Sequence, residues 1–128
     1  MSVIYPDLEK LKKALRKKTV IRRVVESPEA SKSYYLPETG WIDLSSYGVT
    51  GFLIYSPDGD PLSCQVELSD GEDSGDLVGY AIQASDYVVG AWNSIIMPEA
   101  LALNKIRLRV TTGSTPPTKI KMIAVLRP

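Results

Sequence analysis

Two segments near the C-terminus alternate strictly between apolar and cationic residues. Segment 105–110 reads Lys-Ile-Arg-Leu-Arg-Val, and segment 119–123 reads Lys-Ile-Lys-Met-Ile. A period of two is that of a β-strand with one buried and one solvated face. We therefore predict two strands here, each with an apolar side on a core and a basic side in solvent.

The rest of the chain after residue 19 consists of β-branched and aromatic runs separated by clusters of Gly, Pro, Ser and Asp, a pattern typical of many short antiparallel strands. No long helix alternates with these runs, which disfavours a parallel sheet. We predict an all-β fold, an antiparallel two-sheet β-sandwich of the jelly-roll type, with about eight strands. The candidate strands are Val20–Val25, Ser33–Leu36, Trp41–Leu44, Val49–Ser56, Leu62–Leu68, Leu77–Ala84, Tyr87–Val89, Ala91–Met97, Lys105–Thr112 and Thr118–Leu126.

Two connections have strong turn chemistry. Residues 56–61 read Ser-Pro-Asp-Gly-Asp-Pro, and residues 113–117 read Gly-Ser-Thr-Pro-Pro. Such residues favour tight reversals of the chain. We therefore expect a hairpin at 56–61 and a loop between two strands at 113–117, with each pair of flanking strands antiparallel.

One helix is predicted, over Pro6–Lys18, because Leu8, Leu11 and Leu15 recur at helical spacing and the opposite side is almost purely cationic. A short helix of this kind needs an apolar surface to lie on. Docking on its own sandwich, or on the acidic middle of a neighbouring subunit, is favoured over binding to nucleic acid or anionic lipid. The candidate basic contact surface is Lys12, Lys13, Arg16 and Lys17.

Charge is segregated along the chain, although the formal net charge of the 128 residues is zero. Residues 1–23 hold eight bases and two acids, residues 24–104 hold one lysine and thirteen acids, and residues 105–128 hold six bases and no acid. This distribution predicts oppositely charged surfaces, or subunits that meet through them. We divide the chain into a basic helix at 1–19 and one β-sandwich domain at 20–128.

The sequence contains no histidine, which excludes Ser-His-Asp and Cys-His catalysis within the chain. The single cysteine, Cys64, has no intrachain disulfide partner, and we expect it to be a buried, unreactive thiol. Neither a secretory signal nor a membrane-spanning run is predicted. We therefore expect a non-enzyme located in a virion if the protein is viral, and in the cytoplasm otherwise.

The densest group of acids lies between residues 58 and 76, where seven carboxylates occur without an intervening base. Four of them could converge on one calcium ion from a single loop. A solvated acidic hairpin tip is the favoured interpretation, and a glycosidase acid–base pair is disfavoured because such pairs need a rigid separation. The candidate calcium ligands are Asp70, Glu72, Asp73 and Asp76, and no other cofactor is predicted.

Aromatic residues are frequent for a chain of this size. If exposed, they would form a platform on which sugar rings stack, whereas packing in the core is the alternative that we favour. The candidates for such a platform are Trp41, Trp92, Tyr34 and Tyr35.

Three segments, Tyr35–Tyr47, Cys64–Gly71 and Ile106–Ser114, together resemble the galactose-binding-like, discoidin-like jelly rolls found in phage and viral structural proteins. The shared features are an Asp-Leu-Ser strand end, a Val-Glu-Leu-Ser-Asp-Gly hairpin and a late Arg-Leu-Arg-Val strand. The resemblance covers about residues 20–126. It implies attachment, sugar recognition or capsid and tail assembly, and it supplies no ligand residues.

The leading hypothesis is a non-enzymatic structural protein of the virion type that associates with copies of itself or with other virion proteins. The alternative from another class is a carbohydrate-binding module with exposed Trp or Tyr and a possible calcium ion. A nucleic-acid-binding accessory protein is the third and least favoured hypothesis.

Overall fold

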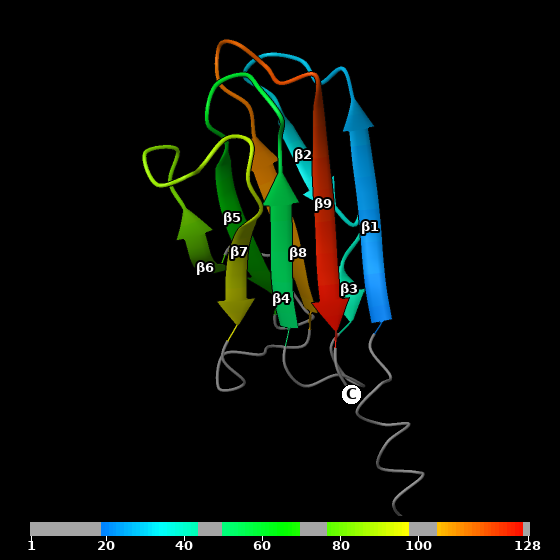
Figure 1. The fold of residues 1–128 in the computed structure, drawn as a ribbon. Coiled ribbons are helices and arrows are strands. Elements are labelled where there is room, and N and C mark those ends of the chain that lie inside the picture. The colour runs from blue at the N-terminus through cyan, green and yellow to red at the C-terminus, as the bar shows by residue number, and fades with distance from the viewer. Residues whose placement is uncertain (1–18, 44–49, 70–76, 98–104, 127–128) are drawn as a thin grey trace, which may run out of the picture.

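The structure is a computed structural model that describes residues 19–43, 50–69, 77–97 and 105–126. These residues form two antiparallel β-sheets with a shared core between them (Figure 1). The predicted β-sandwich is therefore confirmed. The described residues contain no helix, and so none that could cross a membrane. The helix predicted over Pro6–Lys18 lies outside them.

Sheet A has the strand order β1-β9-β4-β7, and sheet B has the order β2-β8-β5-β6, with the short strand β3 also paired to β8. The strands of sheet A are β1 (Thr19–Glu26), β4 (Thr50–Tyr55), β7 (Asn93–Met97) and β9 (Lys119–Leu126). Those of sheet B are β2 (Ser33–Leu36), β3 (Ile42–Asp43), β5 (Ser63–Ser69), β6 (Leu77–Ile82) and β8 (Lys105–Thr111). Apart from β3, two four-stranded sheets that interleave early and late strands have the arrangement of a jelly roll.

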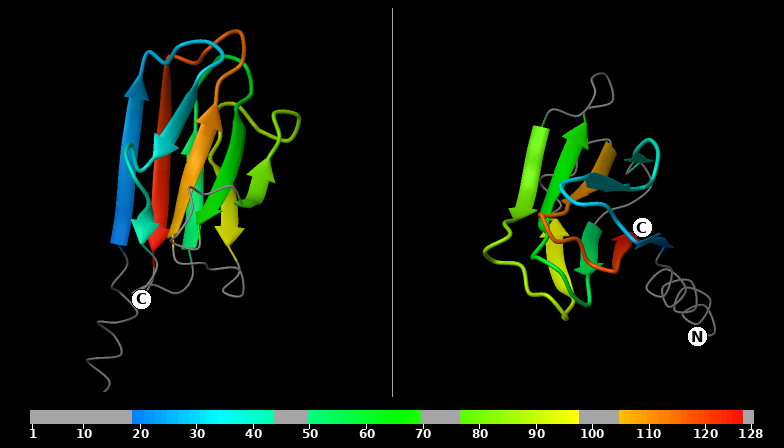
Figure 2. Two further views of the ribbon diagram at one scale, coloured as in Figure 1. Left: turned by 180° about the vertical axis from the view of Figure 1, so that it is seen from behind. Right: turned by 90° about the horizontal axis from the view of Figure 1, so that it is seen from above.

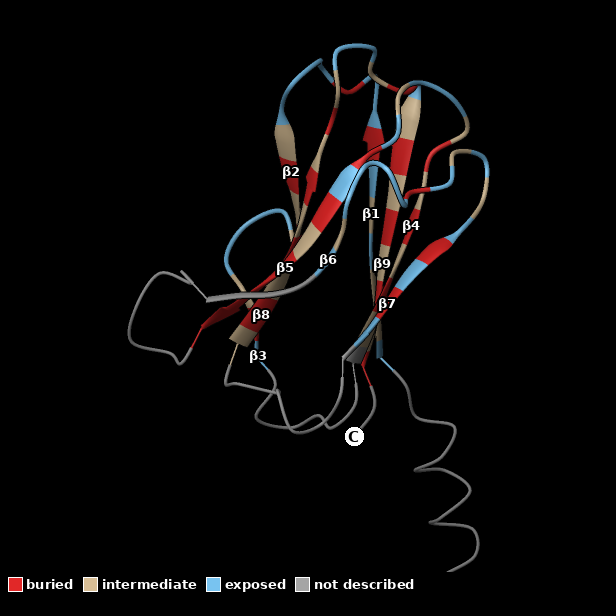
Figure 3. Ribbon diagram, turned by 90° about the vertical axis from the view of Figure 1, so that its left-hand side faces the viewer, coloured by how far each residue is buried: buried red, intermediate tan, exposed pale blue. Residues whose placement is uncertain are grey.

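The core lies between the sheets, as the edge-on view of Figure 3 shows. In β9 the residues alternate between half-buried and buried along the whole strand, and β8 repeats this alternation. The two most regular patterns of the sequence therefore form a central strand in each sheet. Their fully buried side chains include Ile106, Leu108, Val110, Ile120 and Met122.

The hairpin predicted at 56–61 is wrong, and the strands on either side of the loop predicted at 113–117 do not pair with each other. Residues 56–61 lead from β4 in sheet A to β5 in sheet B, and residues 113–117 lead from β8 in sheet B to β9 in sheet A. A tight reversal of the chain is compatible with both a hairpin and a crossing between layers. Here the apolar faces of both flanking strands point to one core, and the chain crosses from one sheet to the other.

The predicted strand over Tyr87–Val89 is also wrong, because this segment belongs to the loop between β6 and β7. The side chain of Asn93 makes the hydrogen bonds to this segment that a neighbouring strand would otherwise make. Its Oδ1 accepts a hydrogen bond from the backbone N–H of Val88 at 2.9 Å, and its Nδ2 donates to the carbonyl oxygens of Val88 and Ala91, both at 3.0 Å. The backbone groups of Val88 and the carbonyl of Ala91 are thus satisfied without a strand.

Four loops meet at one end of the sandwich, at the top of Figure 1, namely 27–32, 56–62, 83–92 and 112–118. The view from above in Figure 2 shows them crossing from one sheet to the other. Backbone hydrogen bonds connect them, from Ser31 to Gly113, from Asp60 to Thr115 and from Gly90 to Ser56, at 2.8–2.9 Å. This end of the molecule is therefore cross-linked by hydrogen bonds between loops.

Candidate functional site

The outer face of sheet A carries exposed apolar side chains. Val24 on β1, Ile96 on β7 and Trp92 just before β7 are 51%, 71% and 49% exposed. The other apolar residues at outward positions are half-buried, and they are Val20, Leu53, Ile123 and Val125. Large apolar side chains gathered on one exposed face are a feature of contact surfaces.

Trp92 lies against Tyr55 of β4, with 5.3 Å between the ring centroids and 37° between the ring planes. The Nζ atom of Lys121 lies 5.6 Å from the centroid of the Tyr55 ring, in cation–π geometry. Trp92 also lines a groove of about 310 Å³ whose other walls are residues 22–24 of β1 and 121–123 of β9. The lining contains three cations, Arg22, Arg23 and Lys121, and no carboxylate.

The outer face of sheet B has a different chemistry. In β8, Lys105, Arg107, Arg109 and Thr111 point outward, because the residues between them are buried in the core. Their partners in the register on β2 and β5 are mostly polar or aromatic, and they include Ser33, Tyr35, Ser63, Gln65 and Glu67. This face is therefore a polar array.

Arg107 is the centre of this array. Its Nε donates to Oε1 of Glu67 at 2.6 Å, and its guanidinium carbon lies 4.6 Å from the Tyr35 ring centroid and 4.2 Å from that of Trp41. The carboxylate is almost fully covered, since the Glu67 side chain is 9% exposed. The charged pair and the two aromatic rings hold one another in place.

Arg109 extends the array along β8. It donates a hydrogen bond to Oε1 of Gln65, and its Nη1 lies 3.8 Å from Oε2 of Glu67. Glu67 therefore faces two arginines, of which Arg109 is the more accessible, with a side chain 36% exposed. The guanidinium of Arg109 is the part of this network that a ligand in solvent can reach.

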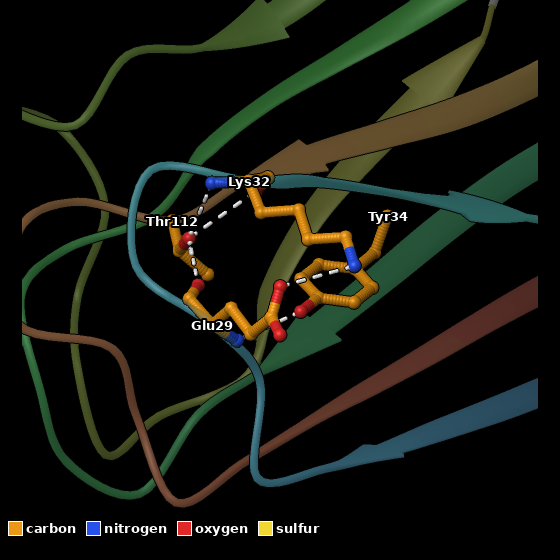
Figure 4. Close-up of polar contacts among 4 residues, drawn as sticks. All are labelled: Glu29, Lys32, Tyr34 and Thr112. Carbon is orange, nitrogen blue, oxygen red and sulfur yellow. Dashed lines mark hydrogen bonds and ion pairs between the residues drawn. The ribbon is translucent and has the colours of Figure 1, made fainter.

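Tyr34 and Tyr35 do not form a pair, because neighbours in a strand point to opposite faces. Tyr34 is buried, and its Oη accepts a hydrogen bond from the backbone N–H of Glu29 at 2.7 Å (Figure 4). Beside it, the Thr112 hydroxyl accepts from the Lys32 N–H at 2.9 Å and donates to the Glu29 carbonyl at 2.6 Å. Tyr34 thus has a structural role in anchoring loop 27–32.

The predicted aromatic platform is divided by the fold. Tyr35 and Trp41 lie together on the outer face of sheet B, Trp92 lies on the outer face of sheet A, and Tyr34 is in the core. The predicted calcium ligands and the basic contact residues lie outside the described residues. Among the residues that are described, no group of three or more potential metal ligands occurs.

Arg107, Arg109, Gln65, Glu67 and Tyr55 were not among the residues predicted to form a site. The alternation in 105–110 predicts that the two arginines are exposed on one face. Nothing local in the sequence indicates the partner of Arg107, because Glu67 is 40 residues away and meets it only through the β5–β8 register.

Cys64 is fully buried in β5, as predicted. Burial raises the pKa of its thiol from 9.0 to about 12. Burial also raises the pKa of Tyr87 to about 12, against the lowering effect of its 2.8 Å hydrogen bond with Ser56. The Cys64 thiol is thus protonated near neutral pH, which removes its nucleophilic form.

No family model matches the chain, and no curated protein is detectably similar to it in sequence. Among solved structures, a chain from the disulfide-linked pili of Bacillus endospore appendages aligns at 10% identity, with a TM-score of 0.42, over 87% of this chain and 90% of its own length. A CBM4 carbohydrate-binding module aligns at 10% identity, with a TM-score of 0.40, over 87% of this chain and 71% of its own. Likeness at this level concerns the path of the backbone alone.

Proposed function

We propose that the protein is a non-enzymatic structural protein that assembles with further copies of itself, as the subunits of a virion do. The contact surface is the outer face of sheet A. The observation that carries this proposal is the exposure of Val24, Trp92 and Ile96 on that one face. In a sheet with one solvated side, polar residues are expected at such positions.

The occupant of this face is a second copy of the chain, and charge complementarity supports this choice. The charged residues that point outward from sheet A are Arg22, Glu26, Lys119 and Lys121, so three of the four are cations. The four cross-linked loops hold the opposite charge, with one lysine, Lys32, and four carboxylates, Glu29, Asp58, Asp60 and Asp86. The molecule thus has a cationic apolar face and an acidic end.

A contact between two different surfaces is heterologous. Repetition of such a contact produces rings or open filaments, whereas a contact of one surface with itself stops at a dimer. Burial of the apolar side chains stabilises the contact, and the opposite charges orient the two subunits and raise the rate of association. The expected products are therefore oligomers whose size increases with protein concentration.

Sedimentation velocity of the full chain over a range of concentrations tests the proposal. Ile96→Lys and Val24→Lys place a charge in the apolar part of the face, and each should shift the distribution to monomer. Ala81→Lys is the matched control, because Ala81 is exposed on the outer face of sheet B and pairs with Gln65. Association should also weaken as salt is raised. A wild-type protein that stays monomeric at its highest soluble concentration would overturn the proposal, as would equal dissociation by the control.

A further inference from the structure

The outer face of sheet B combines half-buried aromatic rings with fixed hydrogen-bonding groups. Tyr35 and Trp41 both contact the guanidinium of Arg107. One guanidinium covers a single face of a ring, and Tyr35 and Trp41 are both half-buried residues. Each ring therefore has a contact with Arg107 and, in addition, surface that a ligand can reach.

The guanidinium that contacts both rings and the backbone of Tyr35 are held in place before any ligand arrives. Arg107 is held by Glu67 at 2.6 Å, and the backbone carbonyl of Tyr35 accepts a 2.8 Å hydrogen bond from Nη1 of Arg23. Arg23 in turn lies 3.6 Å from a carboxylate oxygen of Glu38. A site whose side chains are already ordered loses little conformational entropy on binding.

The neighbouring outward positions offer hydrogen-bonding groups in a row. Ser33 and Thr111 share a hydrogen bond between their hydroxyls at 2.9 Å, Ser63 lies opposite Thr111, and Gln65 lies opposite Arg109. From Lys105 to Thr111 the outward side of β8 extends over about 20 Å at the rise of an antiparallel strand. An array of this length suits a chain of several sugar units.

From these observations we infer that the outer face of sheet B binds an acidic polysaccharide. A pyranose ring has an apolar C–H face, which stacks on Trp41 or Tyr35, and a rim of hydroxyl groups, which pair with amide, hydroxyl and guanidinium groups. The fixed charges favour an acidic sugar, because Lys105, Arg107 and Arg109 exceed Asp43 and Glu67 by one positive charge. The carboxylate of a uronic acid would accept hydrogen bonds from Arg109.

This site is separate from the assembly face and does not depend on it. The two faces belong to opposite sheets, so that a subunit can contact another copy through sheet A and a glycan through sheet B. In an assembly, many weak glycan sites would act together, and the apparent affinity for a polymer would greatly exceed that of one subunit.

Affinity electrophoresis in gels that contain polygalacturonate or, as the neutral comparison, hydroxyethylcellulose tests the inference. The full chain should be retarded by polygalacturonate and less so by the neutral polymer. Trp41→Ala should weaken retardation at least tenfold. Trp92→Ala, compared at a protein concentration at which sedimentation shows wild type and variant to be monomeric, is the matched control, since it removes the same side chain from the other sheet and should then leave retardation unchanged. Thermal unfolding of both variants verifies that they are folded.

Arg109→Gln provides a second variant with little effect on packing, because Arg109 is partly exposed. It should reduce binding to polygalacturonate more than binding to the neutral polymer, because only the acidic polymer loses a charged partner. No retardation of the wild-type chain by polygalacturonate would overturn the inference, as would equal losses in Trp41→Ala and Trp92→Ala. Binding of a single-stranded oligonucleotide through Trp41 in place of polysaccharide would also overturn it. Sedimentation measures self-assembly and electrophoresis measures polysaccharide binding. Failure of one proposal can therefore be told apart from failure of the other.

Discussion

Gly59 lies directly against Pro117, in the loop that follows β8. A Cβ atom at residue 59 would lie 2.6 Å from the backbone nitrogen of Pro117, and the backbone of Gly59 has a φ of +80°. Both observations require glycine, the first because of contact and the second because L-residues rarely adopt such a φ. This contact holds two of the crossing loops together.

Gly59→Ala should therefore lower the free energy of unfolding by about 3 kcal/mol or more. Gly40→Ala is the matched control, because Gly40 has a φ of +73° but no atom within 4 Å of the added Cβ. The control should cost about 1 kcal/mol, from backbone strain alone. Urea unfolding of both variants measures the difference, and equal costs would show that the contact with Pro117 relaxes freely.

Asn93→Ala should destabilise the loop between β6 and β7. The variant loses three hydrogen bonds to Val88 and Ala91 and leaves their backbone groups without those partners, which should cost about 2–4 kcal/mol. Ser94→Ala, at an exposed position next in the chain, should cost less than about 0.5 kcal/mol. Amide hydrogen exchange at Val88 checks the mechanism, because protection there should fall in Asn93→Ala and persist in Ser94→Ala.

Arg107→Lys keeps the charge but removes the planar group that contacts both rings. An ammonium group cannot reproduce this stacking, and the variant should lose about 1–2 kcal/mol of stability. Arg22→Lys, on the exposed outer side of sheet A, is the comparison and should be nearly neutral. Thermal unfolding checks both, at roughly 4 °C per kcal/mol for a chain of this size. If Arg107→Lys is as stable as the wild type, the rings do not depend on the guanidinium for their packing.

The buried thiol predicts a loss of stability at alkaline pH. The pKa of Cys64 is raised from 9.0 to about 12, so above pH 9 the unfolded chain releases a proton that the folded chain retains. The stabilising contribution is complete below pH 9 and should fall from there toward pH 12, by up to about 1.4 kcal/mol per pH unit. Tyr87 adds to this decline from its ordinary pKa of 10.0 upward.

Unfolding by urea between pH 7 and 11 measures this effect. Cys64→Ala should be less stable at neutral pH, since it leaves a cavity, but its stability should decline less steeply above pH 9. Parallel declines in the two proteins would contradict the assignment to Cys64. In the native wild type at pH 8, a thiol reagent should react only at the rate of unfolding.

The sandwich could be predicted from the sequence because alternation in segments such as 105–110 depends only on local chemistry. The order of the strands could not, because the turn residues at 56–61 specify a reversal and not the sheet in which the chain continues. The same limit applies to the candidate site. Period-two alternation separates Tyr34 from Tyr35, whereas the contact of Arg107 with Glu67 and Trp41 requires the register of three strands. The burial of Cys64 could be predicted only because free cysteine is among the most often buried residue types.

The pairing of β1 with β9 runs along both strands, with Thr19 opposite Leu126. Paired residues of this kind lie about 5 Å apart, and both leave the sandwich at the end away from the cross-linked loops (Figure 1). Residues 19–126 could therefore be spliced into a surface loop of a carrier protein with little distortion of the carrier. The loops at the other end would then face outward, and a peptide grafted there at an exposed position away from Gly59 and Pro117 would be held on a rigid base.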